Sequence, residues 1–362
     1  MCQMITKGSK NSLRLIERRY KMKKKYKALL SIFAICAVTF SLVWFPSQAV
    51  AKDVTINFTT YLPSTYEYTY VSARIADYIN KHGKDVGLKC KFYKDVYKIK
   101  ELLPAIDAGE LDMITALDPF FSKDIPVYGV ISLPWIMDEI PFLKPDQERL
   151  FSRNSPWFKL ESRELAKRGL KLIGIMPGIE RQFMTTKPIE KLEDWKGKKI
   201  RCAGAIELKT LELLGAKGVS MPSGELYGAM QRGMIDGCVG SLGSTFLARH
   251  IYEVCPYIIR APGIFQASWS TVIKLEKWNS LSQDQQELLY TACEVGMWDS
   301  TITLMKGTLY EWALFAEKGI KTIMITGKEK ERWKKATRPA FDWYLKKMGS
   351  LGKESLEALR GK

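Results

Sequence analysis

The stretch that decides the fold runs from Arg181 to Gly237 and reads RQFMTTKPIEKLEDWKGKKIRCAGAIELKTLELLGAKGVSMPSGELYGAMQRGMIDG. The period of its apolar residues changes several times, which is typical of strands that alternate with helices. The pattern predicts strands and helices in turn, in the order 198–202, 205–214, 219–221, 223–232 and 234–240. Such alternation indicates an α/β architecture with largely parallel sheets.

The same alternation continues on both sides of this stretch. Strands are predicted near 54–58, 88–92, 111–117, 170–176 and 265–274. Helices are predicted near 71–83, just before Gly109, at 147–168, at 282–318 with a soft break near Gly296, and at 329–346. The length of 362 residues corresponds to about two ordinary domains. Because no Pro- or Ser-rich linker divides the chain, the pattern favours two lobes that share crossing segments.

The net charge of +17 is concentrated at one end of the chain. Residues 1–51 carry ten Lys or Arg and one acid, and the remaining chain has a net charge of +8. Its basic residues are interspersed with acids, which is typical of a solvated surface. A basic groove for nucleic acid is therefore not expected.

The N-terminal segment has the pattern of an export signal. A basic stretch at 21–27 is followed by an uncharged apolar stretch at 28–45 and then by Ala-Val-Ala at 49–51. This order predicts cleavage after Ala51 and a periplasmic location. The alternative is an uncleaved membrane anchor, since 18 apolar residues nearly span a bilayer. A complete signal could begin at Met22, so the true start codon is open.

The sequence shows no catalytic constellation. His82 and His250 have no metal-ligand spacing to another His or to Cys, and neither a nucleophile elbow nor a P-loop is present. Five cysteines follow the export signal, with wide spacing and no Cys-x-x-Cys. They are interpreted as small buried hydrophobes, although one disulfide bond remains open. We expect no cofactor, no metal and no enzymatic activity.

A series of short motifs follows in a fixed order along the quoted stretch. They are Arg181, Lys187-Pro188-Ile189, Asp194-Trp195-Lys196-Gly197, Lys199-Ile200-Arg201, Leu214-Gly215-Ala216, Met221-Pro222, Glu225-Leu226-Tyr227-Gly228-Ala229 and Gly233-Met234-Ile235-Asp236-Gly237. In this order the chain resembles the substrate-binding proteins of TRAP transporters, the DctP-like family. The resemblance extends to Gly109–Met113, Leu133–Trp135 and Lys277–Leu281, and so covers essentially the whole chain after the signal.

The resemblance implies a two-lobed periplasmic-binding-protein-like fold with crossing strands and one long helix over both lobes. Lobe I would comprise 52–178 plus 267–306, and lobe II would comprise 179–266 plus 307–362. The protein would be a monomer that binds a small organic anion between the lobes and delivers it to TRAP membrane permease subunits. A periplasmic enzyme and a receptor-docking sensory protein on the same scaffold are the alternatives.

The resemblance also implies which residues bind the ligand. Arg201 matches the family arginine that holds a carboxylate, and the planar guanidinium suits that group geometrically. Arg181 is a second expected contact, and Ser241 stands near the position where many relatives carry Asn. Further candidates by position are Tyr61, Tyr66, Asp118, Phe120, Tyr227 and Trp269. For Arg201 the alternative is a structural pair with a neighbouring acid, and for the lining candidates it is core packing.

The export signal gives the first testable prediction. Because the basic, apolar and Ala-x-Ala regions are all present, the secreted protein should begin at Lys52. N-terminal sequencing of the exported protein checks this. A protein that keeps 28–45 and sediments with membranes would show that the segment is an anchor.

Overall fold

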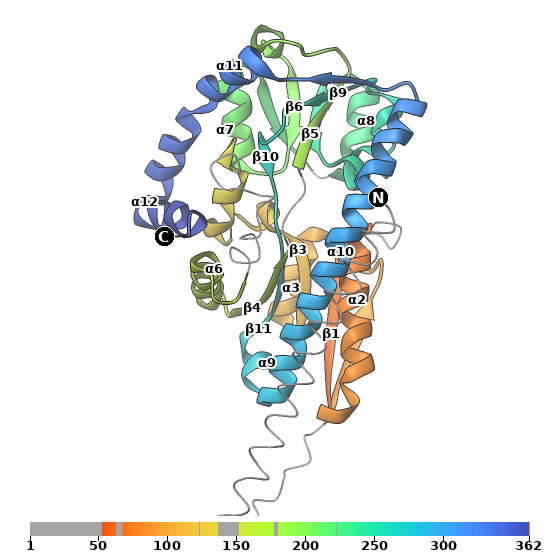
Figure 1. Ribbon diagram of the computed structural model, residues 1–362, viewed down its shortest axis with the longest axis vertical. Helices are drawn as coiled ribbons and strands as arrows, with labels where there is room; N and C mark the ends of the chain where they lie inside the picture. The colour runs from red at the N-terminus through yellow and green to blue at the C-terminus, as the bar shows by residue number, and fades with distance from the viewer. Residues whose placement is uncertain are drawn as a thin grey trace, which may run out of the picture.

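The computed structural model describes residues 53–62, 67–122, 124–136, 152–176, 180–221 and 223–361. The predicted export signal at 1–51 and the candidate Tyr66 lie outside these ranges. No helix within them combines the length and the apolar character needed to cross a bilayer. The chain forms two sheets, one in each lobe, as Figure 1 shows.

The first sheet has the strand order β2-β1-β3-β11-β4. Its strands are β1 (Val54–Thr60), β2 (Leu88–Tyr93), β3 (Met113–Leu117), β4 (Leu170–Met176) and β11 (Trp269–Lys274). The strand β1 is parallel to β2 and β3, whereas β11 is antiparallel to β3 and β4. Helices α2 (Glu67–His82), α3 (Leu102–Ala108), α6 (Pro156–Lys167) and α9 (Leu275–Asn279) accompany this sheet. The parallel pairs explain the connecting helices, because a parallel neighbour requires a crossover.

The second sheet has the order β12-β9-β5-β8-β6-β7, and β10 pairs with β5. Its strands are β5 (Glu180–Thr185), β6 (Lys199–Cys202), β7 (Lys217–Ser220), β8 (Gly237–Gly240), β9 (Tyr257–Arg260), β10 (Phe265–Gln266) and β12 (Lys321–Met324). Its helices are α7 (Ala205–Leu214), α8 (Leu226–Gln231), the π-helical η8 (Leu242–Leu247) and α11 (Gly327–Thr337). Short 3₁₀ segments occur in both lobes of the described structure. They are η2 (Lys84–Val86), η3 (Ile99–Glu101), η4 (Asp118–Phe121), η5 (Pro126–Ser132), η6 (Leu192–Trp195), η7 (Ser223–Glu225) and η9 (Ile251–Glu253).

Two kinds of element connect the lobes, which confirms the predicted fold class. Helix α10 (Gln283–Glu317) contacts α2 and β4 of the first lobe and η8 of the second. The predicted strand at 265–274 is instead two strands, since β10 pairs in the second sheet and β11 in the first. Residues 267–268, called the crossing segment below, join these two strands.

Helix α10 begins where the sequence predicts and runs through the predicted soft break. The Ser282 hydroxyl accepts from the backbone N–H of Gln285, and the Gln285 side chain accepts from the N–H of Ser282. This reciprocal cap satisfies two N–H groups that would otherwise lack partners. The helix continues past Gly296, where the absence of a Cβ allows α2 to approach closely.

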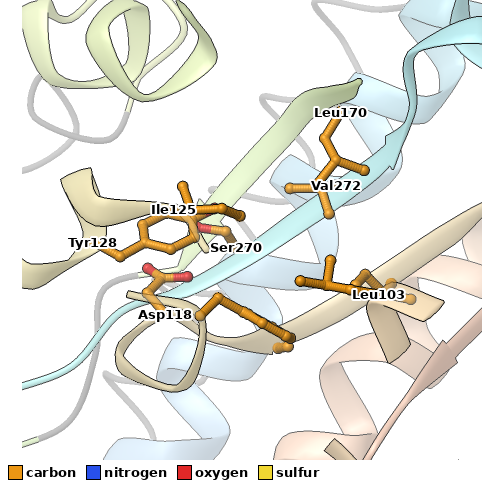
Figure 2. A pocket seen from close by; sticks show the side chains of 10 residues that line it. Leu103, Asp118, Ile125, Tyr128, Leu170, Ser270 and Val272 are labelled. Atoms are coloured by element: carbon orange, nitrogen blue, oxygen red, sulfur yellow. The ribbon is translucent and has the colours of Figure 1, made fainter. Parts of the chain in front are cut away.

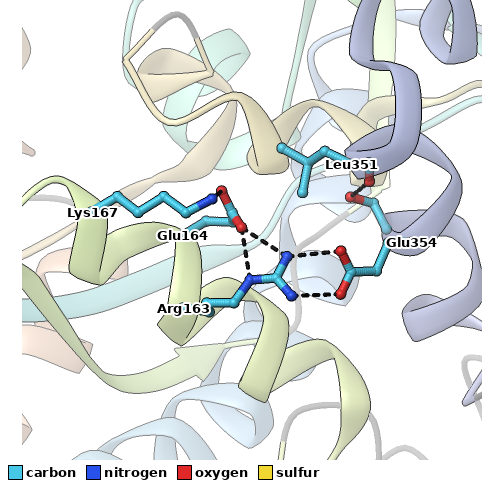
Figure 3. A network of polar contacts seen from close by, with 6 residues as sticks. Arg163, Glu164, Lys167, Leu351 and Glu354 are labelled. Atoms are coloured by element: carbon cyan, nitrogen blue, oxygen red, sulfur yellow. Dashed lines mark hydrogen bonds and ion pairs between the residues drawn. The ribbon is translucent and has the colours of Figure 1, made fainter.

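The C-terminal helix α12 (Pro339–Leu359) packs against η5 and α6 of the first lobe and against α7 of the second. Its buried Phe341 and Tyr344 belong to the same apolar cluster as residues of η5 and α6. At the surface, Arg163 of α6 donates two hydrogen bonds to Glu354 at 2.6 and 2.7 Å, as Figure 3 shows. Helix α12 therefore contacts both lobes, and the predicted lobe division stays a prediction.

The contact at Gly296 yields a stability prediction. A Cβ at this position would lie 2.5 Å from Cγ1 of Ile75, so Gly296→Ala should force α10 and α2 apart. We expect a loss of about 1–3 kcal/mol from overpacking, which exceeds the roughly 1 kcal/mol gained in helix propensity.

Gly228→Ala in α8 is the matched control, because its Cβ would meet only the mobile end of Arg232. Chemical denaturation of both variants measures the difference. Equal or higher stability of Gly296→Ala would show that the helices are not in tight contact there.

Candidate ligand-binding site

Arg181, Arg201 and Ser241 converge at one edge of the second sheet. Arg201 is the third residue of β6 and aligns with Cys238 of the parallel β8, which ends one residue before Ser241. Strand β5 runs antiparallel to β8, with Gln182 opposite Gly240, so its early residue Arg181 lies at the same edge. The register thus brings together three candidates from separate parts of the sequence.

Arg201 is buried without an acidic partner among the described residues. Its side chain is 1% exposed, and Nε donates to the carbonyl of Met221 at 2.9 Å. Nη1 donates to the carbonyl of Val239 at 3.4 Å, whereas Nη2 is buried and has no hydrogen-bond partner within the described ranges. Burial lowers the pKa of Arg201, because the charged form is less well solvated.

Arg181 differs because the protein itself supplies its counter-ion. Nη1 forms an ion pair with Glu207 of α7, and both side chains are almost completely buried. Glu207 also accepts from the backbone N–H of Ala203 at 2.7 Å, which fixes the carboxylate at the start of the helix. Burial and the charge of Arg201 lower the pKa of Arg181 to about 10, so the guanidinium stays charged at neutral pH.

The charges at this edge leave a positive excess. The pair of Arg181 with Glu207 is neutral, and Arg201 therefore contributes one uncompensated positive charge. Arg249 is close enough to lower the pKa of Arg201 further by repulsion. A buried, unpaired guanidinium is costly in free energy, and an anion with two acceptor oxygens would reduce that cost.

Two aromatic candidates lie at the facing edge of the first sheet. Trp269 begins β11 opposite the last residues of β3 and β4, and Tyr61 directly follows β1. Their rings are stacked, with centroids 5.9 Å apart and planes within 8°. The Tyr61 phenol raises the pKa of both Arg181 and Arg201, which places it close to the guanidinium pair.

The structure places Asp118 and Tyr227 away from this point. Asp118 is fully buried inside the first lobe, where the Ser268 hydroxyl donates to its carboxyl. Tyr227 donates to Glu253 at 3.1 Å on an exposed part of the second lobe. Phe120 belongs to η4, but its side chain lies outside the described part of the structure.

Three residues of this region were not predicted from the sequence. Glu207 stands at the third position of its helix, where an acid satisfies the helix start, and that pattern was the available signal. Gln182 and Gln266 are buried, and their side-chain oxygens lack hydrogen-bond partners in the described ranges. No sequence pattern distinguishes these two glutamines from surface ones.

No cluster of His, Cys, Asp or Glu in the described ranges could hold a metal ion. The five cysteines within those ranges are buried and form no disulfide bond. Burial raises the pKa of Cys202 and Cys238 to about 12, so these thiols beside Arg201 stay protonated. The charged groups at the edge are therefore the arginines and Glu207.

Two lobes joined by crossing strands, with a cationic sheet edge facing aromatic residues, define the class of two-lobed solute-binding proteins. The chain belongs to family 7 of the bacterial extracellular solute-binding proteins, whose DctP family model matches residues 87–347. This family consists of binding proteins of transport systems rather than of enzymes.

Similar proteins support this assignment. An uncharacterized Salmonella typhimurium protein, YiiZ, is 28% identical over 56% of this chain and 62% of its own length. The ectoine-binding periplasmic protein TeaA of Halomonas elongata is 26% identical over 59% of this chain and 62% of its own. The chain thus spans somewhat less than two thirds of these relatives. A TRAP periplasmic solute-binding protein from Desulfovibrio salexigens, with bound orotic acid, superimposes with a TM-score of 0.76 at 18% identity, covering 84% and 97% of the two chains.

The pairing of Arg181 with Glu207 predicts a strong effect on stability. Glu207→Gln leaves a buried guanidinium without its counter-ion and should cost about 3–5 kcal/mol of unfolding free energy. Replacing both partners, as Arg181→Met with Glu207→Leu, should recover much of that loss, because no unpaired charge remains.

Denaturant unfolding of the single and double variants checks this pair. The exposed Glu212→Gln on the same helix serves as control and should change the unfolding free energy little. A loss from Glu207→Gln no larger than that of the control would show that the pair is not a structural unit.

Proposed function

We propose that this protein binds a small organic acid between its lobes, with the ligand carboxylate on Arg201. The observation that carries the proposal is the buried Nη2 of Arg201, which has no hydrogen-bond partner in the described structure. Buried polar groups in native proteins are satisfied in nearly all cases. A carboxylate oxygen at this position would both accept the hydrogen bond and neutralise the charge.

Arg181 has the secondary role in this proposal. Its charge is balanced by Glu207. It contributes to binding by donating to the Val239 carbonyl, to which Arg201 also donates, and by adding positive potential beside Arg201. Tyr61 and Trp269 offer a stacked aromatic surface on the opposite side. An acid with a flat or compact apolar body suits this arrangement.

The bound or named ligands of similar proteins are consistent with such a site. Orotic acid and ectoine, named for the Desulfovibrio and Halomonas proteins, both carry a carboxyl group. Membership of the family supports the proposal that the loaded protein delivers its ligand to TRAP membrane permease subunits. We further propose that the protein acts as a periplasmic monomer after cleavage behind Ala51.

The test begins with a thermal-shift screen of mono- and dicarboxylates, including aromatic and keto acids. An acid at 100 times its dissociation constant should raise the unfolding free energy by about 2.7 kcal/mol. Calorimetry with that acid should then show binding weakened about 30-fold to several thousand-fold by Arg201→Ala, which corresponds to about 2–5 kcal/mol. Arg201→Lys should also bind poorly, because Lys lacks the paired donors.

Arg181→Ala should have a smaller effect on affinity than Arg201→Ala, and the exposed Arg232→Ala should have none. Melting temperatures confirm that each variant is folded. A folded Arg201→Ala that binds the acid within threefold of the wild type would refute the assignment. A screen in which only neutral sugars or polyamines stabilise the protein would refute the acid specificity.

A further inference from the structure

A second polar cluster lies inside the first lobe, directly below the crossing segment. It contains Asp118 at the end of β3 and Glu161 on α6, and both side chains are 0% exposed. Ser268 donates to Oδ2 of Asp118, and Ser270 of β11 donates to Oε1 of Glu161 at 2.7 Å. Figure 2 shows Asp118, Tyr128 and Ser270 gathered beside a small cavity.

The two carboxyl groups have no cationic partner in the described part of the chain. Nearby charged and hydrogen-bonding groups influence them, but no Lys, Arg or His is among these groups. The remaining oxygens, Asp118 Oδ1 and Glu161 Oε2, are buried and accept no hydrogen bond within the described ranges. Two buried carboxylates at this proximity cannot both carry a full negative charge, because nothing compensates them.

Two further polar groups face the pair. The hydroxyl of Tyr128 on η5 and the indole of Trp157 on α6 both lie beside Glu161, and burial raises the pKa of Tyr128. The elements α3, β3, β4 and β11 contribute the apolar side chains Leu103, Ile114, Leu170 and Val272 to the cavity. The cavity volume is about 10 Å³, which is hardly enough for one water molecule. Both carboxyl side chains are 0% exposed, so bulk solvent does not reach them.

The pair is attached to the segment that carries Trp269. Besides the side-chain contact, the backbone N–H of Asp118 donates to the carbonyl of Ser268 at 3.0 Å. The crossing segment is thus held on one side of Trp269 by Asp118, and Ser270 on its other side is held by Glu161. Any change in the charge of the pair acts directly on the position of Trp269.

We propose that the buried carboxyl groups of Asp118 and Glu161 retain protons in the folded state and that this protonated pair is a positioning device, which holds the crossing segment and Trp269 at the edge of the ligand site. The titration properties agree with this geometry. Burial raises the pKa of Asp118 to about 7. Burial, followed by the charge of Asp118, raises the pKa of Glu161 well above its ordinary value. A negative charge on Asp118 therefore favours the protonated form of Glu161.

Proton retention by this pair should make the protein less stable as the pH rises. The native state retains a proton that the unfolded chain releases near pH 4. The resulting stabilisation is complete below the ordinary carboxyl pKa and is lost as the pH rises through about 7. Each retained proton changes the unfolding equilibrium constant up to tenfold per pH unit in this window.

The first test is thermal and denaturant unfolding of the mature protein between pH 5 and pH 8. The unfolding equilibrium constant of the wild type should rise up to tenfold per pH unit. That of the uncharged double variant Asp118→Asn with Glu161→Gln should rise less, by up to the same factor. Each single variant should fall between the two. The exposed Asp124→Asn is the control and should follow the wild type. Parallel profiles of wild type and double variant would overturn the proposal.

Infrared spectroscopy gives a readout that does not depend on the variants folding. The wild type near pH 6 should show the carbonyl band of a protonated, buried carboxylic acid, and the band should disappear at high pH. Its absence near pH 6 would overturn the proposal. A band that persists in a folded double variant would assign the proton to another group and would equally contradict the proposal.

The positioning role rests on the proposed function, and its readout is the affinity for the acid found in the screen. Affinity of the wild type should fall between pH 6 and pH 8 more steeply than affinity of the double variant, because Trp269 loses its fixed position. Equal slopes would reject the positioning role. Failure of every acid to bind would reject the proposed function alone, since the unfolding and infrared results test the retained protons independently.

Discussion

The structure depends on a guanidinium charge that the protein buries and does not neutralise. Arg201 is 1% exposed, donates only to carbonyl oxygens and leaves Nη2 without a partner in the described chain. Removing such a charge from water costs several kcal/mol unless a counter-ion is present. The neighbouring Arg181 shows the alternative, because Glu207 neutralises it within the fold. The contrast between the two arginines distinguishes a structural pair from the candidate ligand site.

The lobes place chemically different surfaces on the two sides of that site. The second lobe contributes charge through the ends of β6 and β8, and the first contributes aromatic surface through Tyr61 and Trp269. Both surfaces lie at sheet edges next to the crossing segment, so a ligand that touches both would connect the lobes. Hinge closure around a ligand is the motion that this arrangement supports, with α10 and the crossing segment as the continuous elements. The buried carboxyl pair below Ser268 supports the same segment from inside the first lobe.

Local patterns in the sequence predicted much of this architecture. Periodicity located α10, and the ordered motifs around Lys199–Arg201 identified the family. The role of Arg201 as the carboxylate contact stays a prediction. The predictions were wrong or incomplete where contacts between residues distant in the sequence decide the structure. The uninterrupted β-forming run at 265–274 indicates one strand, and only pairing with two different sheets divides it. Asp118 follows a strand as lining residues do, yet Ser268, 150 positions away, holds it inside the lobe. The role of Glu207 was not predicted, because its partner Arg181 lies on a strand 26 positions earlier.

The most direct test of the central claim is a crystal structure of the protein with a bound organic acid. The account predicts that carboxylate oxygens of the acid lie within hydrogen-bonding distance of Nη2 of Arg201, while Arg181 keeps its ion pair with Glu207. A complex in which the acid binds elsewhere, and in which a protein group satisfies Nη2 of Arg201, would contradict the account.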